Sequence, residues 1–185
     1  MNKNMDLLNL LLARRSCRTF RPEPLDRPTL AAIVEAGRYA PSAMNVQLCR
    51  FYVITDPRLL RRISDTVSRQ LEGFADRDCR YGAPALVLVT NRTSNPCALQ
   101  DAACAMENMM LAACAVGVGS CWINQPYHLR EDAEMRSLLS ELGALPDEFP
   151  CCSLGLGLPE GPLFPGRREH TGNQVTWLVG EEKNS

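Results

Sequence analysis

Residues 98–116, ALQDAACAMENMMLAACAV, restrict the possible folds of this chain more than any other stretch. Alanine, methionine and leucine dominate the segment, and Asp101 and Glu107 are its only charged residues. This composition predicts a long helix that Gly117 ends. A helix with so little charge has to be covered on most of its sides. We therefore expect it to be deeply buried, and a partner subunit is one way to cover it.

The rest of the chain alternates between helix-like and strand-like segments. Helices are expected at 5–14, from 26 to about 39, from 56 to about 71 and at 130–142. Strands are expected at 49–55, 83–90, 151–158 and 174–179, with a short extended piece at 120–123 and a loop at 40–47. Neither repeats nor a linker interrupt this order. We therefore expect one domain over residues 1–185, of the α/β or α+β class.

Length and charge exclude some functions. The 185 residues suffice for one domain with a substantial core. A net charge of -1 provides no long-range attraction to nucleic acids or acidic membranes, so neither is expected as a partner. Eighteen of the twenty basic residues are arginine, which leaves local anion binding open.

Nine cysteines are present, without a C-x-x-C motif or paired metal-ligand spacing. This pattern favours small buried thiols in a reducing cytosol over a disulfide framework. A zinc or iron–sulfur site built from Cys151, Cys152 and His170 is a weaker alternative.

Targeting signals are not evident in the sequence. The apolar run 7–13 is short, and its positive charges follow it, which is the reverse of a signal peptide. Residues 109–123 are apolar but too few to span a bilayer. We expect a cytoplasmic protein.

Several common catalytic motifs are excluded. The glycines of GVGS (117–120) follow a helix, and those of GLGLPEG (155–161) have the wrong spacing for a dinucleotide loop. His128 and His170 are the only histidines, and neither lies in a hydrolase or zinc-protease motif. No metal site and no side-chain nucleophile are expected.

The segment LLARRSCRTF (11–20) places three arginines directly after a helical run. Arg14, Ser16 and Arg18 alternate, so in an extended segment they would project to one side. Guanidinium groups and a hydroxyl so arranged suit a phosphate and a carbonyl-rich ring. Arginines near a helix C-terminus also interact with the helix dipole while staying hydrated, and the segment alone favours neither interpretation.

The segment YAPSAMNVQ (39–47) is dense in uncharged hydrogen-bonding groups. Asn45 and Gln47 each offer a donor and an acceptor, which complements a flavin edge with its N3–H between two carbonyls. This segment shifts the interpretation of the arginines toward a binding site.

These segments resemble the nitroreductase family of FMN-dependent oxidoreductases. The resemblance is carried by RRSCRTF, APSAMNVQ, ENMMLAACAVGVGSCWI and SLGLGLPEGPLFPGRRE, in the family's order over nearly the whole chain. It implies an α+β fold, a three-layer sandwich around a mostly antiparallel sheet flanked by helices. It also implies an intertwined homodimer with FMN at the subunit interface.

The resemblance implies roles for the basic residues. Arg14 and Ser16 would hold the FMN phosphate and ribityl chain, with Arg15 contributing between them. Arg18 would lie near the pyrimidine side, where a guanidinium stabilises negative charge on the reduced ring. Arg168, with Arg167 beside it, would close on the phosphate.

Two further segments would contact the flavin. The loop that reaches it from the partner subunit corresponds to Pro41, Ser42, Ala43, Met44, Asn45 and Gln47. The turn after the buried helix would supply a wall from Cys121, Trp122 and Ile123 and a backbone N–H from Asn124 to flavin N5.

The implied reaction is ping-pong transfer of hydride from NADH or NADPH through flavin N5 to a nitroaromatic, quinone or related acceptor. The reactive atom belongs to the cofactor, so no catalytic side chain is expected. An alternative is a flavin store or redox sensor without significant turnover. A sensor would need a reactive cysteine beside the flavin, and Cys17 and Cys121 are the candidates.

Overall fold

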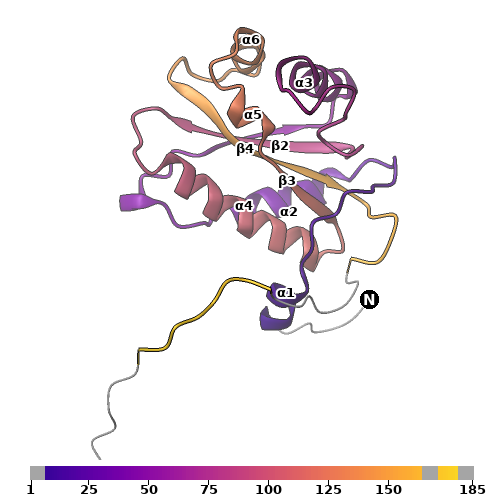
Figure 1. The fold of residues 1–185 in the computed structure, drawn as a ribbon, viewed down its shortest axis with the longest axis vertical. Coiled ribbons are helices and arrows are strands. Elements are labelled where there is room, and N and C mark those ends of the chain that lie inside the picture. The colour runs from indigo at the N-terminus through magenta and orange to yellow at the C-terminus, as the bar shows by residue number, and fades with distance from the viewer. Residues whose placement is uncertain (1–6, 164–170, 179–185) are drawn as a thin grey trace, which may run out of the picture.

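An antiparallel sheet of four strands organises the computed structural model, which describes residues 7–163 and 171–178 (Figure 1). The strands are β1 (Arg50–Ile54), β2 (Ala85–Arg92), β3 (Gly119–Ile123) and β4 (Glu148–Gly157). Their order across the sheet is β1-β2-β4-β3, so β2 and β4 are central. All three pairings are antiparallel.

Helices cover both faces of the sheet (Figure 1). One face carries α3 (Pro57–Gln70), α5 (Gln125–His128) and α6 (Ala133–Glu141). The other face carries α2 (Arg27–Arg38) and α4 (Ala98–Ala115), and α1 (Leu7–Ala13) lies beside α4. A short 3-10 helix, η1 (Ala43–Asn45), follows α2. This three-layer α+β arrangement confirms the predicted fold class.

Two hydrophobic cores lie on opposite sides of the sheet. Between the sheet and α2 and α4, Ile33, Val87, Met106, Met109 and Leu154 are completely buried. The second core lies under α3 and α6 and includes Ile63, Leu86, Leu88, Met135 and Leu138. Alternate residues of β2 enter the two cores, as expected for a strand that is buried on both faces.

Side-chain caps explain where several helices begin. The Asp26 carboxylate accepts a hydrogen bond from the Thr29 N–H at 2.7 Å, and Pro28 occupies the first turn of α2. Asp56 caps α3 in the same way through the Arg58 N–H. Gly117 follows α4 with φ 80, a left-handed conformation that suits glycine after a helix.

The helix α4 is buried only in part, because nine of its 18 residues are buried whereas Leu99 and Cys104 are exposed; the prediction that it is covered on most of its sides is therefore wrong for this chain alone. The helix contacts α1, α2 and three strands of the sheet. Asp101, one of its two charged residues, is itself buried, with 4% of its surface exposed. A buried carboxylate requires hydrogen-bond donors, and these donors turn out to lie at the candidate site.

Three predicted elements need correction. The strand predicted at 151–158 begins at Glu148, because a register shift after Val89 accommodates Pro150 opposite Thr90. The helix predicted at 130–142 is shorter, and the separate helix α5 was not predicted. The strand predicted at 174–179 is wrong for residues 174–178, which are extended but pair with no strand within the described ranges.

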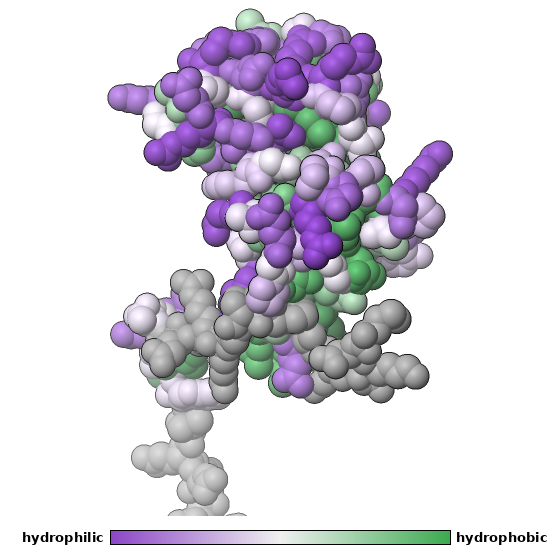
Figure 2. Space-filling view, turned by 90° about the vertical axis from the view of Figure 1, so that its right-hand side faces the viewer, coloured by the Kyte–Doolittle hydropathy of each residue, from purple (hydrophilic) through white to green (hydrophobic). Residues whose placement is uncertain are grey.

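Apolar side chains are exposed at one end of the molecule. Leu7, Leu8, Leu11 and Leu12 of α1 are each 45% exposed or more, and Trp177 is 80% exposed. Figure 2 shows a hydrophilic upper layer at the level of α3 and α6, with the apolar surface lying lower. Within the described residues, no helix is long and apolar enough to cross a membrane.

A buried carboxylate ties three strands together. The Glu148 side chain, 1% exposed, accepts hydrogen bonds from Arg50 at 2.9 Å, Tyr52 at 2.9 Å and Thr90 at 2.9 Å. Burial alone would raise the pKa of Glu148, but these hydrogen bonds outweigh it and lower the pKa below its ordinary value. Glu148 therefore stabilises the fold in its ionised form.

We expect Glu148→Gln to reduce the free energy of unfolding by about 1–3 kcal/mol at neutral pH, because three donors lose a charged acceptor. A carboxyl whose folded-state pKa is lowered stabilises above its unfolded-state pKa, and this contribution is lost as the pH falls through the folded-state value. The difference between wild type and variant should therefore shrink below about pH 4. Urea unfolding of both proteins over a pH series measures this difference in the free energy of unfolding. A difference that does not change with pH would contradict the conclusion that ionised Glu148 stabilises the fold.

Candidate functional site

The arginine-rich segment, residues 14–21, follows α1 and lies along the edge of the sheet. After α1 ends, the Cys17 N–H donates to the Ser120 carbonyl of β3 at 2.8 Å. Phe20 forms a bridge with Pro159, and the Arg21 N–H donates to the Leu158 carbonyl at 2.8 Å. The extended conformation predicted for this segment is thus imposed by pairing with β3 and with the residues after β4.

Gly119 allows this close approach. A Cβ at position 119 would lie 2.8 Å from the Cys17 Sγ, 2.9 Å from the Cys17 Cβ and 3.2 Å from the Gly157 carbonyl oxygen. Side chains do not tolerate such distances. Glycine at the start of β3 therefore leaves the space that the arginine-rich segment needs to lie against the sheet.

Arg14 has an unsatisfied donor. Its Nε is buried and makes no hydrogen bond to the described residues, while a Glu107 carboxylate oxygen lies 3.5 Å away. A buried guanidinium nitrogen without an acceptor is costly unless a ligand supplies one. This geometry fits an anionic group such as a phosphate.

The neighbouring basic residues have different surroundings. Arg15 donates through one guanidinium nitrogen to the carbonyls of Leu12, Ala13 and Arg14, at 2.9, 3.1 and 2.8 Å. It therefore caps the C-terminus of α1, as the alternative interpretation of the segment expected. The Arg18 guanidinium lies over the Tyr81 ring at 5.7 Å from its centroid.

A hollow of about 150 Å³ lies at this edge of the sheet. Ser16 and Arg18 line it together with Pro159, Gly161 and Leu163. The first and last predicted motifs thus meet at one place, although Arg14 is directed toward α4 instead. Arg167 and Arg168 lie outside the described residues.

The residues predicted to form a turn after α4 lie in β3, except for Asn124, which follows the strand and precedes α5. The side chains of Cys121 and Ile123 in β3 are buried in the protein interior, so a ligand could reach only their backbone. Trp122 is partly buried against the core between the sheet and α2 and α4. Its Nε1 donates to the Asn124 Oδ1 at 3.4 Å. The Asn124 side-chain nitrogen lies 3.2 Å from the His128 Nε2. These two contacts, from Trp122 to Asn124 and from Asn124 to His128, order the turn between β3 and α5.

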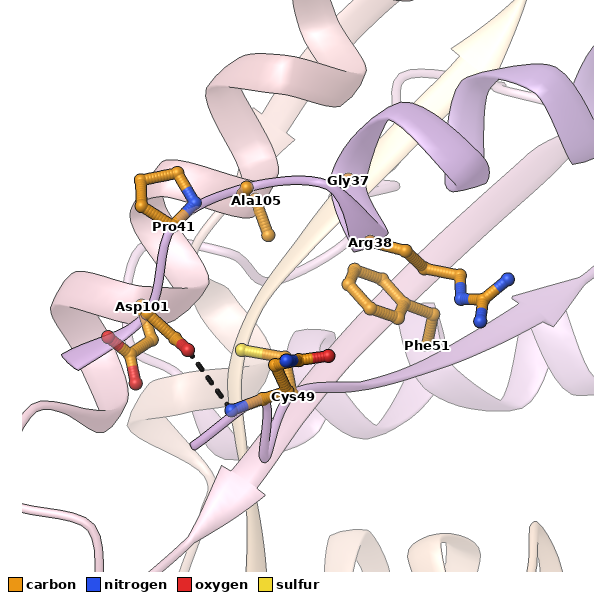
Figure 3. A pocket seen from close by; sticks show the side chains of 10 residues that line it. Gly37, Arg38, Pro41, Cys49, Phe51, Asp101 and Ala105 are labelled. Carbon is orange, nitrogen blue, oxygen red and sulfur yellow. Dashed lines mark hydrogen bonds between the residues drawn. The ribbon is translucent and has the colours of Figure 1, made fainter. Parts of the chain in front are cut away.

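The loop 40–47 borders a pocket of 280 Å³ (Figure 3). Figure 3 shows Pro41 and Asp101 on one side of this pocket and Phe51 on the other. Met44, Asn45 and Gln47 have φ values of 51, 56 and 51, which non-glycine residues rarely adopt. The Gln47 N–H donates to the Ser42 Oγ at 3.0 Å, the dashed line in the figure, and the Gln47 side chain donates to the Asn45 Oδ1 at 3.0 Å.

Within the described part of the chain, the loop makes no hydrogen bond to the arginine-rich segment. The loop is joined to α2 through the Ala40 N–H, which donates to the Gly37 carbonyl at 3.1 Å, and to α4 through the Ala43 N–H, which donates to the Asp101 Oδ1 at 2.9 Å. In the described chain, the arginine-rich segment therefore lies against β3 and residues 159–163, and no hydrogen bond joins it to the loop 40–47.

Burial makes most of the thiols unreactive. It raises the pKa of Cys114 and Cys121, and it raises the pKa of Cys49 and Cys79 to about 11 and that of Cys151 to about 12. The pKa of Cys152 rises further. Cys151 and Cys152 belong to the core under α4, while His170 lies outside the described residues. Among described residues, no three histidine, cysteine or acidic side chains are grouped to hold a metal.

Sequence reasoning missed the residues that support the site. Asp101, Asn91 and Asn95 form a buried polar group beside the loop, and His128 contacts Asn124. Asp101 had one signal, because a carboxylate in an otherwise apolar helix must find donors. Asn91 lies near the end of β2 and Asn95 in the turn after it, and neither had such a signal in the sequence.

The chain is similar to known proteins over most of its length. The model of the nitroreductase family matches residues 11–158. A protein of Archaeoglobus fulgidus named "Putative NADH dehydrogenase/NAD(P)H nitroreductase" is 29% identical over 161 residues, 84% of this chain and 86% of that protein.

Solved structures share the fold. A nitroreductase from Bacteroides fragilis with bound FMN is 31% identical, with a TM-score of 0.85 over 95% of this chain and 100% of that chain. A nitroreductase from Desulfitobacterium hafniense, also with bound FMN, has a TM-score of 0.80 at 23% identity, over 94% of this chain and 98% of that one.

We expect Gly119→Ala to lower the free energy of unfolding by about 1–3 kcal/mol, because the added methyl forces Cys17 away from β3. Hydrogen exchange of the Cys17 amide should accelerate in parallel. Gly161→Ala is the matched control, since a Cβ there meets no atom within 4 Å. Equal effects of the two substitutions would argue against the close contact.

Proposed function

This chain belongs to the nitroreductase family, and we propose that it is an FMN-dependent oxidoreductase that takes its electrons from NADH or NADPH. The observation that carries the proposal is the buried Arg14 Nε, which has a Glu107 carboxylate oxygen at 3.5 Å but no hydrogen-bond acceptor, in a segment whose Cys17 pairs with β3. The FMN bound in the Bacteroides fragilis relative supports it. We expect residues 1–185 to act as one FMN-binding domain in the cytoplasm.

The proposed phosphate site combines Arg14 and Ser16, and for this the Arg14 side chain would have to turn from Glu107 of α4 toward the hollow that Ser16 lines. The Arg14 guanidinium would donate to phosphate oxygens in place of its missing acceptor. Arg15 would act indirectly, because it already caps α1 and so fixes the position of its neighbours. Arg167 and Arg168 are proposed to complete the phosphate site.

Other residues would bind the ring. Bound FMN would supply a ring that accepts hydride at N5 and passes electrons to a nitroaromatic, quinone or related acceptor. Arg18 is exposed enough to lie beside the pyrimidine side and favour negative charge there. The Asn124 backbone N–H would donate to N5, and Cys121, Trp122 and Ile123 would form the wall beside it.

We propose further that two chains form a homodimer in which each loop 40–47 completes the partner's site. Pro41, Ser42, Ala43, Met44, Asn45 and Gln47 would supply this contact. The exposed leucines of α1 and the exposed Trp177 support the proposal, because apolar surface of this extent favours a protein partner. The lack of a hydrogen bond from the loop to the arginine-rich segment within the described chain also agrees with it.

The alternative is a flavin store or redox sensor without significant turnover. A sensor needs a reactive thiolate beside the flavin. Burial raises the pKa of Cys121, which weakens that candidate. Cys17 is the remaining candidate; it is half-buried, and its thiol donates to the Thr19 carbonyl at 3.2 Å.

Purified protein should be yellow, should be bleached anaerobically by NADH or NADPH, and should regain its colour with a quinone or nitroaromatic acceptor. In sedimentation, the flavin absorbance should travel with a particle of two chains. Protein that is colourless and cannot be reconstituted with FMN would contradict the function. A yellow protein that no nicotinamide reduces would support the store, and a yellow monomer would contradict the dimer.

The two arginines should separate binding from reduction. We expect Arg14→Ala to weaken FMN binding by about 10- to 100-fold, because a charged hydrogen bond to the phosphate is lost. Arg18→Ala should slow flavin reduction more than it weakens binding. FMN titration and stopped-flow reduction measure these effects, with Arg21→Ala as a control in the same segment. Identical profiles for the Arg14 and Arg18 variants would contradict the division of roles.

A further inference from the structure

The loop 40–47 is held in an unusual conformation without glycine. Met44, Asn45 and Gln47 all have left-handed φ values between 51 and 56. Met44 is 95% exposed, so its side chain does not hold the loop in place by packing. Backbone conformations of this kind persist only when the surrounding structure determines them. The loop therefore requires anchors outside itself.

A buried carboxylate provides the first anchor. Asp101, 4% exposed, accepts the Ala43 N–H at 2.9 Å through Oδ1 and the Asn95 side-chain N–H at 2.9 Å through Oδ2. Asp101 lies in the first turn of α4, where the helix dipole favours a negative charge. The carboxylate thus connects the start of η1 to the rigid helix at the centre of the fold.

Two asparagines extend the network to the other end of the loop. The Asn95 side-chain nitrogen also lies 3.2 Å from the Asn91 Oδ1, and the Asn91 nitrogen donates to the Cys49 Sγ at 3.4 Å. Backbone N–H groups fix both amides, since Cys97 donates to the Asn95 Oδ1 and Arg92 to the Asn91 Oδ1. Cys49 directly precedes β1, so the network contacts the loop at Ala43 and the chain just after the loop at Cys49.

We propose that Asp101 is a positioning residue, and that the Asn91–Asn95–Asp101 network holds the loop 40–47 in its left-handed conformation before flavin binds. This proposal rests on the proposed function, because the loop is taken to contact the partner's flavin. Asp101 touches neither flavin nor substrate in this assignment. It acts through the Ala43 amide and gives the loop a fixed shape, which lowers the cost of ordering it on binding.

The test compares two substitutions of Asp101 with a matched control. Asp101→Ala removes both acceptors, whereas Asp101→Asn keeps one acceptor for Ala43 but turns a donor toward Asn95. Ser64→Ala is the control, because Ser64 is also buried and hydrogen-bonded, to Asp78 at 2.6 Å, but lies in α3 on the opposite face of the sheet.

Hydrogen exchange of the Ala43 amide in flavin-free protein tests the network directly. We expect exchange to accelerate by about tenfold or more in Asp101→Ala, less in Asp101→Asn, and not beyond the global effect in Ser64→Ala. Unchanged exchange in both Asp101 variants would overturn the proposal. If Asp101→Ala does not fold, the comparison of Asp101→Asn with Ser64→Ala decides.

FMN affinity tests the positioning role. Asp101→Ala should weaken FMN binding by about tenfold relative to Ser64→Ala at matched stability. Faster exchange with affinity equal to that of the control would overturn the link between the loop and flavin. Wild-type protein that binds no FMN would instead contradict the proposed function, and the exchange experiment would still test the anchor.

Discussion

β2 and β4 pair along the middle of the sheet, and nearly every residue of both strands is buried. Such a pair needs apolar cover on both faces, which α4 with α2 and α3 with α6 provide. Because β2 and β4 are central, β3 is left as an edge strand. The arginine-rich segment pairs with that edge through Cys17, so the location of the candidate site follows from the order of the strands.

Predictions from the sequence were accurate where local signals and burial agree. The caps at Asp26 and Asp56 and the composition of α4 located these helices within one or two residues. α5 is only four residues long and depends on its contacts with β4, so local sequence did not indicate it. Residues 174–178 have the composition of a strand but no neighbouring strand in the described chain, and composition alone cannot supply the missing hydrogen bonds.

The candidate site was predictable in part. The extended segment, its proximity to the residues after β4 and the turn at Asn124 follow from motifs in the sequence. The separate directions of Arg14, Arg15 and Arg18 do not, because they depend on Glu107, on the end of α1 and on Tyr81. The roles of Asn91 and Asn95 were hidden for a similar reason, since only folding brings them beside Asp101.

The left-handed residues of the loop 40–47 carry side chains where glycine would be the easier choice. Glycine would relieve the backbone, but it would remove the amide groups of Asn45 and Gln47. In the proposed contact with the partner's flavin, the loop would present these amide groups at defined positions, at the cost of a less favourable backbone. A protein engineer who stabilised this segment with glycine would relax the backbone and remove the amide groups through which the loop is proposed to contact flavin.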